Sequence, residues 1–309
     1  MTLGIAVLGT GGIVQRSFAP ALKAVEDASL VAVLSRDATR GAALAQQYGI
    51  PEVYHDLDAL LRSSQVEAVI VATPDATHES QVIAAAQAGK HVLCEKPMTT
   101  TYAGSQRMAA AVRANGITFA MGYSLRFTTG LQRVEALLRA GRIGQVRYAR
   151  ALWDARQKDP QDWRAHSDQA RYWALSAVGT HLVDLWRWYF GEPASVGGAI
   201  VSPVYQGPND ELSTLVLDYP GRLLAELTVA AVFHDANRLE LYGDAGSIIG
   251  EGLFGYAPEG GTIICNGEVI PYEPVNAFVA EVTDFVQAVQ QQRAPRATLE
   301  DGLRNVRIL

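Results

Sequence analysis

The sequence predicts two folded parts: an α/β domain built on a doubly wound parallel sheet, and an α+β domain with a large, mainly antiparallel open sheet. Over residues 1–122, short apolar runs alternate with helical patterns, which is typical of parallel strands joined by helices. A glycine-rich turn follows the first apolar run directly. After residue 191 the pattern changes to short strands joined by tight turns, which is typical of antiparallel pairing. We therefore expect domains at residues 1–122 and 123–309.

The first strand is expected at Gly4–Leu8, an apolar run that suits a sheet covered on both faces. The turn Gly9–Ile13 follows, and a helix begins beyond it. Gly9 permits the tight turn, Gly11 lets the backbone approach a pyrophosphate, and the helix offers N–H groups at its positive end. Val14 stands where the dinucleotide fingerprint has a third glycine, so the pattern is incomplete. The expected dinucleotide-binding residues here are Gly9, Gly11, Gly12 and Ile13.

The end of the second strand, Leu30–Leu34, indicates which dinucleotide is used. A site that prefers NAD usually places a carboxylate there, which accepts hydrogen bonds from the ribose. This chain has Ser35 and Arg36, whose hydroxyl and guanidinium groups suit a 2′-phosphate. We expect Asp37 to cap the next helix instead. A solvated arginine is the alternative for Arg36. The preferred cofactor is therefore expected to be NADP(H), with NAD(H) as the alternative.

The centre of the first domain reads as one strand–helix–strand unit. An apolar strand at Val69–Val71 is followed by a helical pattern at His78–Ala88, which Gly89 ends as a C-cap glycine. A second strand, His91–Cys94, then runs into Glu95–Pro97. Ligands in open α/β sheets bind at the carboxyl ends of the strands. The unit therefore brings Lys96 to the ligand-binding edge.

The run ATPxxxH…AxxAGKHVLCEKPM over residues 72–98 resembles the oxidoreductase family named after glucose–fructose oxidoreductase, inositol dehydrogenase and a rhizopine-catabolism protein (Gfo/Idh/MocA). The resemblance covers essentially the whole chain and is strongest over residues 4–126. It implies a Rossmann domain and hydride transfer between a nicotinamide and a sugar, sugar derivative or polyol. It also implies a homodimer or homotetramer formed through the C-terminal sheet. Further residues expected at the cofactor site are Thr73, Pro74, His78, Glu95 and Lys96.

Lys96 is the leading catalytic candidate. A lysine at a strand end can be partly desolvated and can hydrogen-bond a hydroxyl or carbonyl oxygen of a substrate. Glu95 can hold it in place, and Pro97 permits a cis peptide that would aim the lysine side chain. A surface lysine in an exposed loop is the alternative.

The second domain is expected to contain a short series of helices and strands. A helix at Leu131–Ala140 precedes a strand at Gln145–Trp153, and an amphipathic helix at Asn276–Gln292 lies near the end. Between them, alternating strands are expected at Ser195–Val204, Leu212–Tyr219, Leu223–Val232 and Arg238–Tyr242.

The segment Ala174–Asp184 resembles the family segment in which an Asp and a His, four positions apart, relay a proton near the nicotinamide. His181 is present, but Ala177 stands at the Asp position. An imidazole titrates in the useful pH range, so His181 is expected to handle the proton while Lys96 polarises the substrate oxygen. A helix histidine satisfied by its neighbours is the alternative. Carboxylates that can replace the missing one are Asp184, Asp154 and Asp162.

All five tryptophans lie between Trp153 and Trp188, together with Arg156, Arg164 and Arg171. Aromatic faces can line a sugar-sized pocket, and arginines can bind carboxylate or phosphate. Trp186 and Trp188 fit the core or an interface better. Tyr123 and Arg126 lie in the segment between the domains, and bridging the two is their alternative role. The substrate-site candidates are Tyr123, Arg126, Trp153, Trp163, Arg164 and Asp184.

Composition and missing motifs exclude several classes of function. The net charge of −6 argues against nucleic acid or an anionic membrane as a partner. No apolar run approaches the roughly 20 residues of a spanning helix. The two cysteines and the absence of a signal-peptide pattern favour the cytoplasm. No metal site is expected, because Cys94 and His91 point to opposite faces of a strand and no paired metal motif occurs. A hydrolase elbow is also absent.

Two other functions stay open. Ala177 allows a nucleotide-bound regulator without turnover, as in a yeast galactose-pathway repressor of this family. The tryptophan-rich segment would also suit aromatic substrates, as in dihydrodiol dehydrogenases or biliverdin reductases, which share this architecture.

Overall fold

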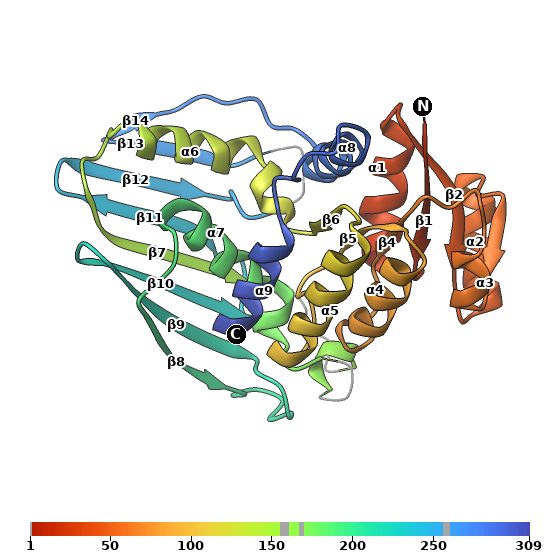
Figure 1. Cartoon of the computed structure of the whole chain (residues 1–309). Coiled ribbons are helices and arrows are strands. Elements are labelled where there is room, and N and C mark those ends of the chain that lie inside the picture. The colour runs from red at the N-terminus through yellow and green to blue at the C-terminus, as the bar shows by residue number, and fades with distance from the viewer. Residues whose placement is uncertain (1, 155–160, 167–169, 256–259) are drawn as a thin grey trace. The chain divides into compact units, whose positions relative to one another are not determined.

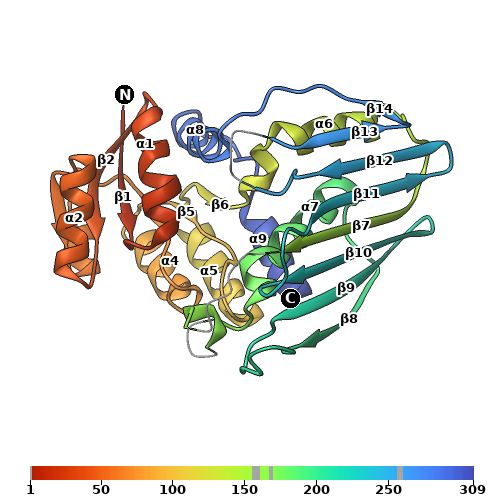
Figure 2. The same ribbon diagram turned by 180° about the vertical axis from the view of Figure 1, so that it is seen from behind.

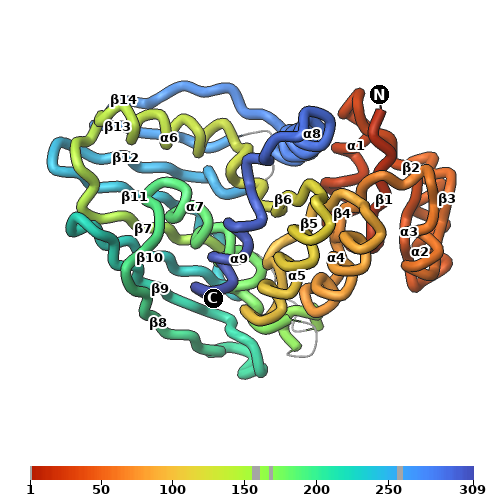
Figure 3. Tube along the Cα trace, viewed as in Figure 1, coloured from red at the N-terminus to blue at the C-terminus, as the bar shows by residue number. Residues whose placement is uncertain are grey.

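The computed structural model of the protein describes residues 2–154, 161–166, 170–255 and 260–309. They divide into two compact units: residues 1–123 with 278–307, and residues 124–277 with 308–309. The sequence assigned everything after residue 122 to the second domain, whereas helices α8 (Ala277–Gln290) and α9 (Leu299–Ile308) pack mainly with the first. The apolar face of α8 explains this return, because Phe278 packs edge-on against Phe18, with ring centroids 5.2 Å apart. Figure 3 shows the blue α8 beside the red α1 (Ala19–Ala24).

The first unit is a doubly wound parallel sheet in the strand order β3-β2-β1-β4-β5-β6 (Figure 1). The order reverses between β1 and β4, and such a reversal creates the crevice where ligands bind. β1 and β4 are buried along their whole length, as their apolar sequences predict. The strands are β1 (Leu3–Leu8), β2 (Ala28–Leu34), β3 (Glu52–Tyr54), β4 (Ala68–Val71), β5 (His91–Cys94) and β6 (Phe119–Met121).

The connecting helices begin and end where local sequence signals predict. Asp37 caps α2 by accepting a hydrogen bond from the Arg40 N–H at 3.0 Å, which confirms the predicted cap. Gly89 and Gly116 adopt left-handed φ angles of 71° and 61° after their helices. The helical segments are η1 (Val14–Phe18), α1 (Ala19–Ala24), α2 (Ala38–Tyr48), α3 (Leu57–Leu61), η2 (Asp75–Thr77), α4 (His78–Gln87) and α5 (Tyr102–Asn115).

The C-terminal segment of the first unit packs against the edge strand β6. The Met121 N–H donates to the Ala297 carbonyl at 3.0 Å. Gly302 on α9 then lies so close that an added Cβ would sit 2.7 Å from the Met121 sulfur and 3.0 Å from that of Met98. Only glycine lets the helix approach the sheet this closely.

The second unit is an eight-stranded sheet in the order β14-β13-β12-β11-β7-β10-β9-β8. Its described pairings are antiparallel except for β7 with β10, which confirms the predicted, mainly antiparallel sheet. Its strands are β7 (Val146–Asp154), β8 (Ser195–Val201), β9 (Leu212–Tyr219), β10 (Leu223–Ala230), β11 (Asn237–Gly243), β12 (Gly246–Glu251), β13 (Thr262–Cys265) and β14 (Glu268–Val269).

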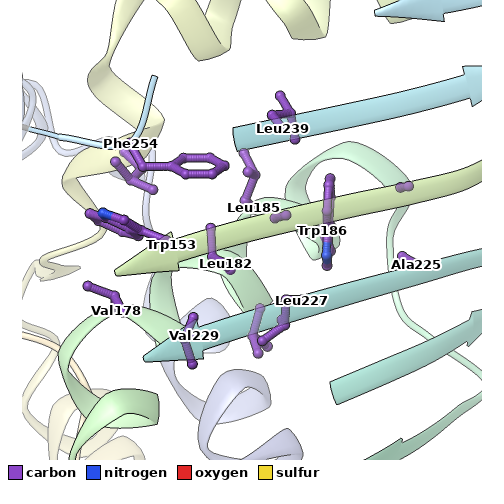
Figure 4. Packing of buried hydrophobic residues seen from close by; sticks show 14 of the residues in the cluster. Trp153, Val178, Leu182, Leu185, Trp186, Ala225, Leu227, Val229, Leu239 and Phe254 are labelled. Carbon is purple, nitrogen blue, oxygen red and sulfur yellow. The ribbon is translucent and has the colours of Figure 1, made fainter. Parts of the chain in front are cut away.

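Two helices, α6 (Thr129–Arg139) and α7 (Thr180–Phe190), lie on one face of this sheet (Figures 1 and 2). The core lies between them and the alternately buried strand residues, as Figure 4 shows around Trp186, Leu227 and Leu239. Trp186 is fully buried and its indole N–H donates to the Glu226 carbonyl at 3.1 Å, so this tryptophan is a core residue, as expected. Shorter helical turns are η3 (Ser124–Phe127), η4 (Trp163–Ala165) and η5 (Leu175–Gly179).

Candidate active site

The turn after β1 depends on glycine at its first position. Gly9 has a φ of 108°, and an added Cβ would lie 2.9 Å from the Ala72 carbonyl oxygen, so glycine is required there. A Cβ on Gly11 would meet no atom within 4 Å. The backbone is therefore open at the point where a pyrophosphate would approach. A helical segment runs from Gly12 through α1, so its N-terminal N–H groups face this turn.

Arg16 adds a cation that the sequence analysis did not identify. A Cβ on Gly12 would lie 2.6 and 2.7 Å from its two terminal guanidinium nitrogens, so the guanidinium lies directly over the glycine turn. Arg16 is exposed. Its position four residues after Gly12, in the first turns of the helix, was the available signal.

At the end of β2, Ser35 is buried and shapes the turn into α2. Its hydroxyl donates to the Asp37 carbonyl at 2.7 Å and accepts from the Asp37 N–H at 3.2 Å. The Asp37 carboxylate is occupied by the helix cap and by an ion pair with Arg40 at 3.4 Å. Arg36 is exposed between them. The one carboxylate among residues 35–37 is therefore already engaged within the turn.

His78 is fully buried and ties two loops of the site together. Its Nε2 lies 2.9 Å from the Thr73 carbonyl oxygen, and its Nδ1 lies 3.0 Å from that of Pro97. The ring nitrogens thus contact the backbone after β4 and the backbone after β5. His78 therefore joins these two loops, and its place at the cofactor site stays a prediction. The Thr73 hydroxyl donates to the Gln81 side chain at 2.6 Å.

Lys96 follows β5 and is 7% exposed, as is Glu95. This burial contradicts the alternative of a surface lysine. The Lys96 N–H donates to the Glu95 carboxylate at 3.1 Å, and the Lys96–Pro97 peptide is cis. Burial, together with the nearby Glu95 and Asp75, raises the pKa of the Cys94 thiol well above its usual range. The lysine therefore stands at a desolvated strand end that is rich in carboxyl groups.

In the second unit, His181 lies in the first turn of α7 and is 1% exposed. Trp153, at the end of β7, packs against two rings: its centroid lies 5.8 Å from that of His181 and 5.5 Å from that of Phe254. Figure 4 shows Trp153 and Phe254 side by side, with Val178 below. Ala177, at the position of the family Asp, is also buried in the preceding turn. Trp153 is therefore placed to hold the histidine ring.

The carboxylates considered as partners of His181 have different surroundings. Asp184 accepts two hydrogen bonds from the Arg126 guanidinium, at 2.6 and 2.7 Å, inside the unit. Asp162 accepts from the Arg164 N–H at 2.9 Å and caps η4. Asp154 is 4% exposed and follows Trp153 on β7. Of the three, Asp154 directly follows Trp153, whose ring packs against that of His181.

The remaining substrate candidates belong to different units: Tyr123 to the first, and Trp163 and Arg164 to the second. Arg164 stacks on Trp163, with its guanidinium carbon 4.0 Å from the ring centroid. Tyr123 is fully buried at the end of the first unit. Arg156 lies outside the described residues.

Asp210 is a second residue that the sequence analysis missed. Its carboxylate accepts from the Trp173 and Leu175 N–H groups at 2.6 and 3.0 Å and from the Ser213 hydroxyl at 2.6 Å. Burial raises its pKa above the usual value, although these three donors act in the opposite direction. Asp210 therefore fixes the start of the helical segment that carries Ala177 and His181.

Two negative findings apply to the described parts of the chain. No group of three or more His, Cys, Asp or Glu side chains is arranged to hold a metal ion. No helix among them is long and apolar enough to cross a membrane.

Comparisons with known proteins agree with the fold described above. Residues 3–123 match the family model for the GFO/IDH/MocA oxidoreductase family, NAD-binding Rossmann fold, and residues 131–249 match the model of the GFO/IDH/MocA C-terminal domain. A 1,5-anhydro-D-fructose reductase from Ensifer adhaerens is 29% identical over 89% of this chain and 84% of its own. A D-xylose 1-dehydrogenase (NADP(+)) from Haloferax volcanii is 28% identical over 98% and 94%. The crystal structure of an aldose-aldose oxidoreductase from Caulobacter crescentus, complexed with glycerol, superposes with a TM-score of 0.92 and 28% identity over 100% of this chain and 95% of that one.

Proposed function

The chain belongs to the Gfo/Idh/MocA family of NAD(P)-dependent oxidoreductases, and from this premise we propose that it transfers hydride between NADP(H) and a sugar, sugar derivative or polyol. The observation that carries the proposal is Lys96, a buried lysine at the carboxyl end of β5. Relatives that reduce or oxidise sugars support the substrate class, since two of them align over most of their length.

The residues of the first unit would bind the cofactor and orient it. Gly9 and Gly11 let the backbone approach the pyrophosphate, and Arg16 supplies a cation above the same turn. Arg36 would bind the 2′-phosphate, because a guanidinium pairs with phosphate through two donors. When bound, the nicotinamide ring supplies or accepts the hydride.

The protein's own groups would then manage the substrate oxygen and its proton. Lys96 donates a hydrogen bond to that oxygen, which favours charge development on it during hydride transfer. His181 takes up or returns the proton of the hydroxyl group, and Trp153 holds the imidazole ring in place. Asp154, beside Trp153, is the carboxylate we propose in the role of the missing family Asp.

The proposal is tested first by cofactor binding. Wild-type protein is titrated with NADPH and with NADH while nicotinamide fluorescence is followed, and the titrations are repeated with Arg36→Ala. We expect NADPH to bind more tightly and Arg36→Ala to weaken NADPH binding alone. Tighter NADH binding that Arg36→Ala leaves unchanged would contradict the NADP preference.

A panel of sugars, polyols and aromatic diols then tests the substrate class. Turnover of sugars or polyols, lost in Lys96→Met, is the expected result. Turnover of aromatic diols alone would favour a dihydrodiol dehydrogenase-like enzyme. Cofactor binding without any turnover would favour the regulator that the substitution at Ala177 leaves open.

We also propose that two copies associate through the open face of the second sheet. Leu224 and Tyr242 are 44% and 40% exposed on it, and Tyr242 stacks on Tyr148 with ring centroids 6.1 Å apart. Arg150 pairs with Glu226 at 2.9 Å in the next row. A surface with apolar side chains and paired charges of this kind can pack against the same surface of a second copy of the chain. Sedimentation of Leu224→Glu should show a smaller assembly than the wild type; an unchanged sedimentation coefficient would contradict this interface.

We infer a reducing, cytoplasmic location from the cysteines. Both are buried and free in the structure, and unpaired thiols are typical of reducing compartments.

A further inference from the structure

Glu281 on α8 is a buried acid that the function proposed above does not use. Its side chain is 1% exposed. Neither carboxylate oxygen has a hydrogen-bond partner among the described residues. Burial, the nearby Glu95 and Asp284 raise its pKa well above the usual range, and Lys96 acts in the opposite direction. Because an ionised carboxylate without donors is very costly to bury, Glu281 is expected to carry a proton at neutral pH.

The charged groups around Glu281 favour its protonated, neutral form. Glu95 and Lys96 approach it from the end of β5, and both are buried. Asp284 lies on the same helix, and its carboxylate is paired with Arg293 at 2.8 Å. One lysine therefore faces two buried carboxyl groups. The charges of Glu95 and Lys96 balance only if Glu281 is neutral.

We propose that Glu281 is a positioning residue for Lys96 and that it acts as an uncharged carboxylic acid. The inference deepens the proposed function and rests on Lys96 as the group that polarises the substrate oxygen. An ionised Glu281 would attract the lysine ammonium group and compete with the substrate oxygen for its hydrogen bonds. The neutral acid leaves the ammonium group to Glu95 and the substrate.

A first test needs no substrate. Free energies of unfolding are measured from pH 5 to pH 9, values chosen to span about four units above the ordinary carboxyl pKa, for wild type, Glu281→Gln, Lys96→Met and the double variant. The folded wild type keeps a proton that the unfolded chain releases, so its stability falls as pH rises, whereas Glu281→Gln lacks this loss. The ratio of the two unfolding constants should therefore change about tenfold per pH unit until Glu281 ionises in the folded protein.

Comparing these four proteins, with and without Lys96→Met, separates a positioning role of Glu281 from a merely structural one. Without the lysine cation, the folded-state pKa of Glu281 rises further, so the tenfold trend should continue to higher pH. Asp284→Asn is the matched control: it removes a carboxylate one turn away that is already paired with Arg293, and it should leave the trend in place. A pH-independent ratio, or a trend that Lys96→Met leaves unchanged, overturns the proposal.

Two further readouts keep the test decisive if Lys96→Met does not fold. The infrared difference spectrum of wild type minus Glu281→Gln at neutral pH should contain the carbonyl stretch of a protonated carboxylic acid, and its absence overturns the proposal. With a substrate in hand, kcat/KM of the wild type should fall on the alkaline side, and Glu281→Gln should move that fall to higher pH. Identical profiles overturn the positioning role. Failure to turn over any substrate would count against the proposed function, while the unfolding and infrared results still decide the state of Glu281.

Discussion

Arg126 binds the carboxylate of Asp184 through two hydrogen bonds, 2.6 and 2.7 Å long, in the interior of the second unit. Arg126 comes from the turn η3, and Asp184 from the middle of α7. The pair thus fixes the helix that carries His181 to the first segment of the unit. The parallel geometry is the one that a guanidinium and a carboxylate prefer.

Breaking this pair should destabilise the second unit strongly. Arg126→Leu or Asp184→Leu alone removes one member of a buried ion pair, which costs about 3–5 kcal/mol. Replacing both residues with leucine should cost much less than the sum, because no charge is then left behind. Urea unfolding measures all three. The control is Arg139→Leu, which removes an exposed i,i+4 pair with Glu135 and should change the unfolding free energy by less than about 1 kcal/mol. Additive costs at Arg126 and Asp184 would contradict this interpretation.

Asp210→Asn should loosen the start of the helical segment that carries His181. The amide has one acceptor oxygen where the carboxylate serves Trp173, Leu175 and Ser213, so a buried N–H is left unsatisfied, at a cost of about 1–3 kcal/mol. Because burial raises the pKa of Asp210, the folded wild type holds a proton that the unfolded chain has released. This contribution to stability is complete below the ordinary aspartate pKa of about 3.9 and is lost as pH rises toward the raised value.

The free energy of unfolding of Asp210→Asn should therefore lie below that of the wild type by an amount that decreases as pH rises from acid. Unfolding curves between pH 4 and pH 7, values chosen around the carboxyl range, measure it. A deficit that widens over the same interval would show that the folded-state pKa is lowered instead.

Arg16→Gln and Arg36→Ala should separate two parts of the cofactor site. The guanidinium of Arg16 lies over the glycine turn, where both dinucleotides carry a pyrophosphate, so its loss should weaken NADPH and NADH alike by about tenfold or more. In the function proposed above Arg36 binds the 2′-phosphate, which only NADPH carries, so its loss should weaken NADPH binding alone. Fluorescence titration of both variants with both nucleotides provides the comparison. A selective effect of Arg16→Gln on NADPH would place its guanidinium at the 2′-phosphate.

Local patterns predicted the fold well. The apolar strand at His91–Cys94 has the bounds that the sequence indicated, and Asp37 and Gly89 cap helices where expected. These features depend on neighbours a few residues away, which a single sequence displays directly. The return of α8 and α9 to the first unit was missed, because an amphipathic helix shows that it has an apolar face but does not show which surface covers that face.

The candidate site was only partly predictable for the same reason. The motif around Lys96 is continuous in the sequence and could be recognised. The role proposed for Glu281 depends on Lys96, which is far away in the chain. Asp210 likewise depends on the N–H groups of a distant helix start, to which it is hydrogen-bonded. Asp184 looked available to His181 because helical spacing allows that pairing, yet its carboxylate binds Arg126. Partners brought together by tertiary folding cannot be read from spacing.

Cys94 should be chemically inert despite its place beside Lys96. Its thiol is fully buried, and burial together with Glu95 and Asp75 raises its pKa well above the usual range. The thiolate is the reactive form, so a cationic neighbour does not activate this cysteine. Native protein mixed with a disulfide reagent such as 5,5′-dithiobis(2-nitrobenzoate) should release almost no thiolate chromophore, whereas denatured protein should show both cysteines, because Cys265 is buried as well. Cys94→Ala should lower the denatured count by one and leave the native rate unchanged. A rapidly reacting thiol that disappears in Cys94→Ala would mean that the lysine cation outweighs the surrounding carboxyl groups in its effect on the thiol pKa. That result would also contradict the charge balance inferred for Glu95, Lys96 and Glu281.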